Sequence, residues 1–199
     1  MYLPKHFEQS DDEALAALMR DRPLATLVTL AGGSPTADHL PLEYDASSRL
    51  LRGHVARANP LWRHADGSDV LAIFHGPQGY VSPNWYPSKA EHHKVVPTWN
   101  YAVVHAHGRL RAVDDATWLR AHVGRLTERN EAGRVPRWQL ADAPADYVQQ
   151  MLGAIVGIEI AVERLVGKWK LSQNRSEADR RGAIAGLGDV ALAALMQRQ

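Results

Sequence analysis

The sequence contains no cysteine, which excludes disulfide bonds, thiolate metal sites and a cysteine nucleophile. The lack of cysteine also fits a reducing compartment. Excess charge is nearly absent as well, because 23 basic residues are balanced by 22 acidic ones. A net charge of +1 gives no general attraction to nucleic acid or to an acidic membrane, although local patches can still exist.

Long apolar runs are missing, and none approaches the ~18 residues of a membrane-spanning helix. The opening residues MYLPKHFEQSDDEAL have no apolar core of the kind found in signal peptides. We therefore expect a cytoplasmic protein with no membrane partner. A chain of 199 residues, 45% of them hydrophobic, can build one ordinary core. We expect a single domain over residues 1–199 with a helical tail at about 176–199.

Several catalytic and nucleotide-binding motifs are also absent. The chain has no GxSxG, no HExxH, no GxGxxG and no Walker loop. The sequence therefore names no catalytic residue, and it provides neither of the two standard phosphate-binding loops.

Short alternating or β-branched segments dominate the first half of the chain and indicate strands. These segments are 24–30, 36–45, 49–55, 69–76 and 98–113. Most connections are too short for parallel crossovers, so we expect an antiparallel meander. Residues 155–172 alternate as a further strand. Helices are predicted after a capping box at Ser10 and Glu13, over 114–133 and near the end. The prediction is a mainly β fold with peripheral helices, forming a closed or half-closed barrel.

The predicted strand 98–113 carries His105 and His107, which are two residues apart and therefore share a face. Such a pair could supply two metal ligands, but zinc would need a third ligand. The other histidines give no matching spacing. Hydrogen bonding to neighbouring strands or to a ligand explains the pair equally well, so we assign no metal site.

Two further stretches could bind an anion. In HVARANPLWR, Arg57 follows a strand, and Asn59 and Pro60 open a helical turn whose free amides suit a phosphate. The alternative is a capped turn with a solvated arginine. In GKWKLSQNR, Lys168 and Lys170 share one face and Trp169 takes the other. This set could hold an anion and a planar ring, or it could be an edge strand protected by lysines.

Several motifs together resemble the PaiB family of FMN-binding negative transcriptional regulators. They are MYLPKHFEQSD, HLP, RGHVARANPLW, SPNWYPSK followed by VVPTWNYAVVHAHG, and GKWKLSQNR, and the resemblance covers about residues 1–186. It implies an antiparallel FMN-binding split β-barrel, related to pyridoxamine-phosphate oxidases and flavin reductases. It also implies a homodimer with FMN in a groove shared by the two subunits.

The resemblance also implies which residues bind the cofactor. The strand of DHLPLE would run beside the flavin, and the turn HVARAN would hold the phosphate with a single basic side chain. GKWKLSQN would complete the site. The single basic side chain implies either a weaker phosphate affinity or compensation by the lysines at 168 and 170 of the partner chain. The cofactor-binding residues are then His39, Leu40, Pro41, His54, Ala56, Arg57, Ala58, Asn59, Trp169, Lys170, Gln173 and Asn174.

Three functions remain open. The resemblance implies a negative transcriptional regulator, but the chain shows no helix-turn-helix with a basic recognition helix, so a DNA partner has little support from the residues. The alternative is an FMN-dependent oxidoreductase, in which His39, His54 and His105 could titrate near neutrality. A third possibility is a fold that has lost FMN and binds heme or a partner protein.

Overall fold

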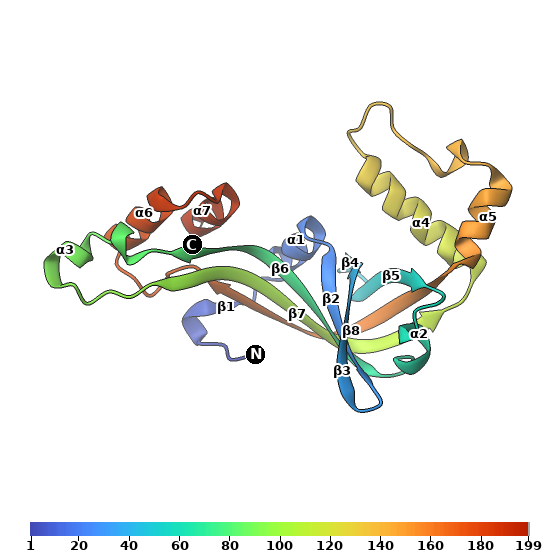
Figure 1. Cartoon of the computed structure of the whole chain (residues 1–199), viewed down its shortest axis with the longest axis horizontal. Helices are drawn as coiled ribbons and strands as arrows, with labels where there is room; N and C mark the ends of the chain where they lie inside the picture. Colours follow the sequence, from blue (N-terminus) through green and yellow to red (C-terminus); the bar gives the residue numbers. More distant parts are fainter. Residues whose placement is uncertain (199) are drawn as a thin grey trace. The chain divides into compact units, whose positions relative to one another are not determined.

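A computed structural model describes residues 1–198 (Figure 1). Its strands are β1 Glu8–Gln9, β2 Leu24–Ala31, β3 Ser34–Pro41, β4 Glu43–Asp45, β5 Leu50–Ala56, β6 Asp69–Val81, β7 Thr98–Val113 and β8 Ile155–Lys170. Its helices are α1 Asp12–Asp21, α2 Leu61–His64, α3 Ser88–His92, α4 Ala116–Glu131, α5 Ala145–Gly153, α6 Glu177–Gly186 and α7 Val190–Gln197. Short 3-10 turns are η1 Lys5–Phe7, η2 Pro83–Trp85 and η3 Leu140–Asp142. Among residues 1–198, no helix is long and apolar enough to cross a membrane.

The strands form one sheet in the order β3-β2-β6-β7-β8-β5-β4, with β1 added to β8. The expected mainly β fold with peripheral helices is confirmed, and β7 has the predicted bounds of 98–113. The predicted strand 36–45 is interrupted at Leu42, whose amide donates to the carbonyl oxygen of Pro23 at 2.9 Å. The simple meander was wrong at two places, because β2 lies next to β6 and β5 pairs with the distant β8.

The chain divides into two compact units, which we describe separately. Unit 1 comprises residues 1–18, 74–105 and 166–199, and unit 2 comprises residues 19–73 and 106–165. The single domain over 1–199 stays a prediction. Within the predicted tail at 176–199 the structure has α6 and α7, while Gln199 lies outside the described residues.

In unit 2, two glycines let neighbouring elements approach closely. A Cβ atom on Gly108 of β7 would lie 2.1 Å from the backbone oxygen of Ala161 on β8. A Cβ atom on Gly157 of β8 would lie 2.2 Å from the ring of Trp118 on α4. Real Cβ atoms do not come this close to other atoms, so neither position accepts a side chain without displacement of its neighbour.

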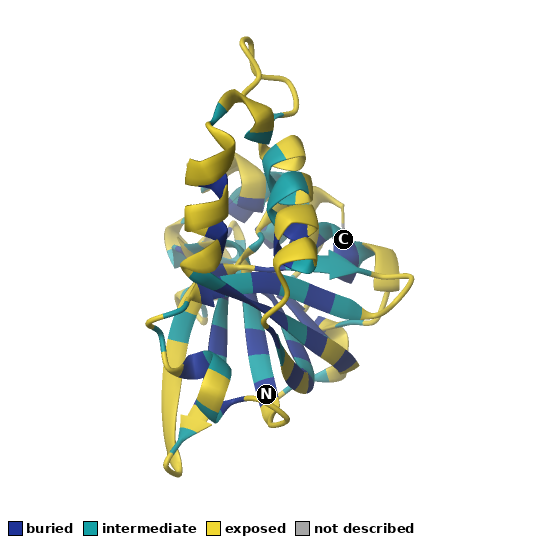
Figure 2. Cartoon of the chain, turned by 90° about the vertical axis from the view of Figure 1, so that its right-hand side faces the viewer, coloured by how far each residue is buried: buried dark blue, intermediate teal, exposed yellow. Residues whose placement is uncertain are grey.

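Helix α4 begins where the sequence provides a cap. The carboxylate of Asp115 accepts a hydrogen bond from the amide of Trp118 at 2.6 Å, which satisfies one of the free amides of the first turn. The helix packs on α5 through a small apolar cluster of Leu119, Val148 and Leu152. Figure 2 shows buried residues concentrated on the strands, whereas the helices carry large exposed faces.

In unit 1, the start of α1 differs from the predicted capping box at Ser10. The side chain of Asp11, not that of Ser10, accepts from a first-turn amide, that of Ala14 at 2.7 Å. Asp11 therefore caps the helix, because its carboxylate also favours the positive end of the helix dipole.

A buried polar contact holds the end of β8 against β7 in unit 1. The amide of Asn100, which is fully buried, donates to the hydroxyl of Ser172 at 2.9 Å and to the sulfur of Met196 at 3.4 Å. Because a buried amide without partners would be costly, these bonds fix the turn after β8 and α7 on the sheet.

We expect Gly108→Ala to destabilise the protein by about 2–4 kcal/mol, because the added methyl group meets the backbone of β8. Chemical denaturation followed by circular dichroism measures this change. The matched control is Gly124→Ala in α4, where nothing lies within 4 Å of the added Cβ. Helix propensity predicts a gain of up to about 1 kcal/mol for the control. Equal stability of the two variants would contradict the close contact between β7 and β8.

Candidate functional site

The predicted cofactor-binding residues fall into two groups in different units. Unit 2 contains His39, Leu40, Pro41, His54, Ala56, Arg57, Ala58 and Asn59, and unit 1 contains Trp169, Lys170, Gln173 and Asn174. The role of each residue toward a cofactor stays a prediction.

Arg57 is the basic side chain of the turn that follows β5. Its Nη1 and Nη2 atoms donate to the two carboxylate oxygens of Asp114 at 2.8 and 2.6 Å. Its Nε and Nη2 atoms also donate to the carbonyl oxygens of Gly153 and Ile155 at 2.7 and 3.1 Å. The ion pair raises the pKa of Arg57 and lowers that of Asp114. A phosphate using the same guanidinium fork would have to replace Asp114.

Asn59 organises the rest of this turn. Its Oδ1 atom accepts from the amide of Leu61 at 2.9 Å, and its Nδ2 atom donates to Asp38 on β3 at 2.7 Å. The indole of Trp62 donates to the carbonyl oxygen of Arg57 at 3.0 Å. The structure therefore shows a capped turn, which was the alternative to a phosphate site in the sequence analysis. Its arginine, however, is paired with a carboxylate and is not merely solvated.

His54 lies in a cluster between β5 and α4. Its Nδ1 atom is 3.2 Å from Nε2 of His122, and the imidazole of His122 stacks on Trp118 with ring centroids 5.0 Å apart. His122 is only 1% exposed, and its Nδ1 atom lies 3.7 Å from a carboxylate oxygen of Glu43 on β4. The cluster therefore joins a predicted cofactor residue to a buried imidazole on the covering helix.

Burial makes these two histidines weak bases. It lowers the pKa of His54. It also lowers the pKa of His122 to about 4, and the charges of His54, Arg125 and Arg52 act in the same direction. Neutral imidazole is therefore the stable form of His122 near neutral pH.

Glu159 on β8 supports the same cluster from the other side. Its carboxylate accepts from the indole of Trp118 at 2.9 Å and from Arg111 at 2.6 Å, and Arg52 lies 3.6 Å away. Although burial alone would raise the pKa of Glu159, these hydrogen bonds and charges lower it. The carboxylate therefore stays ionised and fixes the indole against which His122 stacks.

The other predicted residues of unit 2 differ in exposure. His39 and Pro41 on β3 are exposed, as are Ala56 and Ala58 in the turn. Leu40 is 5% exposed and belongs to the core.

In unit 1, Trp169 is 4% exposed and packs in the core. Gln173 fastens the turn after β8, because its Nε2 atom donates to the carbonyl oxygen of Trp169 at 2.6 Å and its Oε1 atom accepts from the amide of Leu171 at 2.7 Å. Asn174 is exposed and lines a cavity of about 510 Å³ together with Arg175 and other polar residues.

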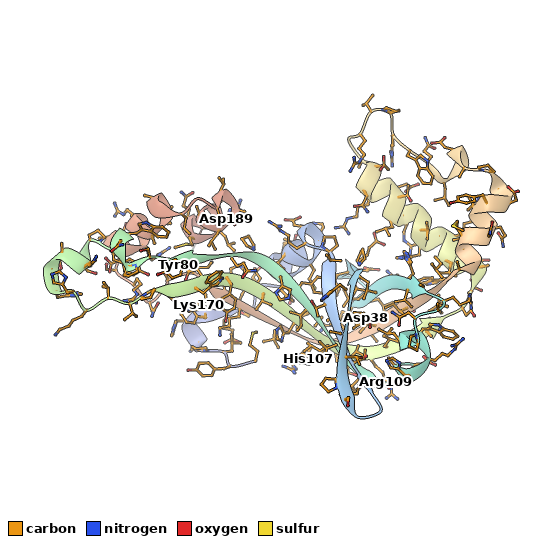
Figure 3. All side chains as sticks on the ribbon, in the orientation of Figure 1. Asp38, Tyr80, His107, Arg109, Lys170 and Asp189 are labelled. Carbon is orange, nitrogen blue, oxygen red and sulfur yellow. The ribbon has the colours of Figure 1, made fainter. Side chains whose placement is uncertain are left out.

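Lys170 is the last residue of β8 and is half-buried, and Figure 3 marks its position. Its ammonium group donates to the carbonyl oxygen of Trp99 at 2.7 Å and to the hydroxyl of Thr98. Burial lowers the pKa of Lys170, and the charges of Lys168 and Arg175 add to this effect.

Residues outside the predicted set form an aromatic face on unit 1, which we define as Tyr80, Trp99, Tyr101 and Lys168. Trp99 is 50% exposed and Tyr80 is 49% exposed, and their ring centroids are 6.3 Å apart. The ammonium group of Lys168 lies 5.5 Å from the ring centroid of Tyr101. Lys168 is itself only 8% exposed, whereas the half-buried Lys170 lies beside Trp99. Two half-exposed rings beside this ammonium group suit a flat anionic ligand, which stacks on the rings and pairs with Lys170.

The aromatic residues Trp99 and Tyr101 of the motif VVPTWNYAVVHAHG were not among the predicted ligands. Strand alternation, which places these two rings on one face, was the available signal. His122 was missed altogether, because a single histidine in a helix carries no motif.

His105 and His107 both lie on β7. In the part of the chain that the structure describes, no group of three histidine or acidic residues is arranged to hold a metal ion. Burial lowers the pKa of His107, and the charge of Arg164 adds to this effect.

The pKa of His122 predicts how stability depends on pH. Its folded value of about 4 lies below the ordinary 6.5, so the unfolded chain binds more protons between these values. The stability contributed by neutral His122 is complete above about pH 6.5 and is lost as the pH falls toward 4. We expect the free energy of unfolding to fall by up to about 3 kcal/mol across this window.

Urea titrations between about pH 7 and pH 4 measure this dependence. His122→Phe, which keeps a stacking ring, should flatten the curve, while the control His75→Phe on an exposed position of β6 should leave it unchanged. An unchanged curve for His122→Phe would show that another group controls the acid sensitivity.

Known proteins agree with this architecture. Structures similar in fold include the flavocytochrome of Azotobacter vinelandii, with a TM-score of 0.66 and 14% identity over 90% of this chain and 78% of that chain. A FAD and heme binding protein of Mycobacterium smegmatis has a TM-score of 0.64 and 18% identity over 90% and 80%. At these identities the likeness concerns the fold alone, which is the flavin-binding split barrel.

Sequence relatives are closer. The family model described as "Putative FMN-binding domain" matches residues 1–164. The chain is 33% identical to "Protease synthase and sporulation protein PAI 2" of Bacillus subtilis, over 94% of this chain and 89% of that protein. It is 34% identical to an uncharacterised protein of Emericella nidulans, over 94% and 90%. The chain therefore belongs to the PaiB family of split-barrel proteins with an FMN-binding domain, and its cofactor is FMN.

Proposed function

We propose that this protein is a homodimeric, FMN-binding negative transcriptional regulator of the PaiB type. The observation that carries the proposal is the relationship to the Bacillus protein along nearly the whole chain, since that relative's name refers to protease synthase and sporulation. A cytoplasmic location follows from this role. DNA is the partner in this proposal, although the net charge of +1 means that any contact depends on a local basic patch.

The aromatic face of unit 1 fits the flavin. FMN, when bound, supplies a redox-active ring. Trp99 and Tyr80 offer exposed ring surfaces for stacking, and Lys170 offers a cation whose desolvation favours pairing with an anion. The chemistry of this donor set therefore matches a flat phosphorylated ligand.

Unit 2 holds the other predicted cofactor residues. Exposed His39 and Pro41 on β3, and the fixed turn around Arg57, are the available surfaces. A homodimer provides two copies of each group, which is why we propose that both subunits contribute to each cofactor site. Light scattering at micromolar concentration tests the dimer, and a monomer would contradict it.

Arg57 can be tested against its structural role. If it contacts the phosphate, Arg57→Ala weakens FMN binding by about 1–3 kcal/mol, the range for losing a charge-assisted contact. Asp114→Asn then keeps or strengthens binding, because it leaves the guanidinium available. Equilibrium titration of the apoprotein with FMN measures both variants. Unchanged affinity in Arg57→Ala, or an equal loss in the two variants, would remove Arg57 from the cofactor contacts.

A second candidate is an FMN-dependent oxidoreductase acting on a small molecule. The observation that favours it is Lys170, an amine with a lowered pKa that touches the backbone of the exposed Trp99. Such a group could hold or donate a proton beside a bound ring. The sequence shows no basic recognition helix for DNA, so we keep the oxidoreductase as an alternative to the regulator.

Two assays on the same FMN-loaded preparation separate the candidates. The regulator predicts binding to DNA from its own promoter region, in a gel shift that weakens steeply as salt is raised. The oxidoreductase predicts NADH or NADPH oxidation that is lost in Lys170→Met but retained in Lys89→Met, a lysine on α3. No gel shift together with oxidation would replace the first proposal by the second.

A further inference from the structure

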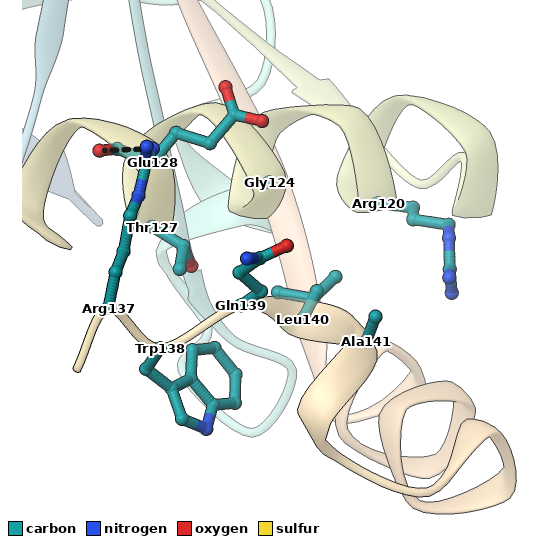
Figure 4. A pocket seen from close by; sticks show the side chains of 9 residues that line it. All are labelled: Arg120, Gly124, Thr127, Glu128, Arg137, Trp138, Gln139, Leu140 and Ala141. Carbon is teal, nitrogen blue, oxygen red and sulfur yellow. Dashed lines mark hydrogen bonds between the residues drawn. The ribbon is translucent and has the colours of Figure 1, made fainter. Parts of the chain in front are cut away.

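A cavity far along the chain from the predicted cofactor residues lies between α4 and the loop that follows it, within unit 2. It has a volume of about 400 Å³, which is in the range of small-molecule sites. Its lining consists of Arg120, Gly124, Thr127 and Glu128 of α4 and the consecutive residues 137–141 of the loop (Figure 4). We call it the α4 cavity.

The loop side of the α4 cavity is held in place by polar bonds. Arg137 donates to the carbonyl oxygen of Glu128 at 3.1 Å, and the amide of Trp138 donates to the carboxylate of Glu131 at 3.3 Å. The amide of Gln139 donates to the carboxylate of Asp142 at 2.8 Å. These bonds order the backbone of the loop, so they fix the positions from which its side chains reach the cavity.

Trp138 is 46% exposed, although hydrogen bonds hold the backbone of the loop around it. This exposure carries a free-energy cost. A large aromatic ring gains stability when it is buried, and here half of it remains in water. A fixed and exposed indole at the edge of a cavity is a surface on which a second ring can stack.

Gly124 opens the helix side of the cavity. It lies in the interior of α4, where glycine costs up to about 1 kcal/mol relative to alanine. Its backbone does not require glycine, because it is not among the residues with positive φ and nothing lies within 4 Å of a Cβ atom placed there. The missing side chain therefore has one structural effect, which is to widen the cavity opposite the loop.

The charges of the α4 cavity favour an anion. Arg120 and Arg137 stand at its two ends in the view of Figure 4, and the carboxylate of Glu128 points away from the loop. Arg137 uses one hydrogen bond on the backbone of α4, while a guanidinium has five N–H donors. The hydroxyl of Thr127 and the amide of Gln139 add neutral hydrogen-bonding groups between the two cations.

We propose that the α4 cavity binds a flat aromatic molecule that carries a carboxylate or a phosphate group. Its ring stacks on Trp138, and its anionic group pairs with Arg120 or Arg137. This site is separate from the residues assigned to FMN, so it gives the protein a second, small-molecule ligand.

Isothermal titration calorimetry of the FMN-loaded full-length protein tests the proposal with two probes, indole-3-carboxylate and phenyl phosphate. We expect at least one of them to bind with a Kd below about 1 mM, and the better probe identifies the anionic group. Inorganic phosphate and uncharged indole should bind at least about tenfold more weakly, because each makes only one of the two contacts.

Three variants locate the binding. Trp138→Ala should weaken the better probe at least about tenfold, and Gly124→Phe should do the same by filling the cavity. Gly124→Ala is the matched control and should stay within about threefold of the wild type. Circular dichroism and FMN content confirm folding, and Trp138→Ala keeps the test valid if Gly124→Phe does not fold. Absence of binding for both probes, or wild-type affinity in Trp138→Ala, would overturn the proposal.

Discussion

The pairing of β5 with β8 is the constraint on which the unit 2 site depends. Seven residue pairs, from Leu50 with Ala161 to Ala56 with Ile155, fix the register of these strands. A shift by one residue would turn every side chain to the opposite face. The observed register directs His54 toward α4 and brings Arg57 to the end of α5, where its guanidinium finds Asp114 and two carbonyl oxygens.

The polar cluster under α4 shows how this constraint is stabilised. Buried charges and imidazoles are costly unless they have partners. Glu159 is bound by an arginine and an indole. The neutral imidazole of His122 stacks on that indole and meets the ring of His54 edge to face. His54, which belongs to the family motif RGHVARAN, is in this way linked to a helix outside the motif. The geometry of the predicted cofactor turn therefore depends on residues outside the predicted cofactor-binding set.

Local patterns predicted much of the fold and less of the site. The alternation over 98–113 identified β7 with its observed bounds, because strand periodicity is a property of neighbouring residues. The partner of β5 could not be predicted in this way, since β8 begins about a hundred residues later and pairing leaves no local signal. The Asp114 partner of Arg57 was missed for the same reason. A sequence motif also does not show which of its side chains are buried. Trp169 and Trp99 both lie in family motifs, but Trp169 is 4% exposed and Trp99 is 50% exposed.

The composition of the two units has a consequence for the order of events during synthesis. Unit 1 contains residues 1–18, 74–105 and 166–199, and unit 2 contains residues 19–73 and 106–165. A ribosome adds residues from the N-terminus onward, and native contacts form only between segments that have emerged. Neither unit can complete its fold before β8 has left the exit tunnel, because both units contain residues of β8. Until then the apolar faces of the earlier strands lack part of their native packing. During that interval the nascent chain is most exposed to aggregation and most dependent on chaperones.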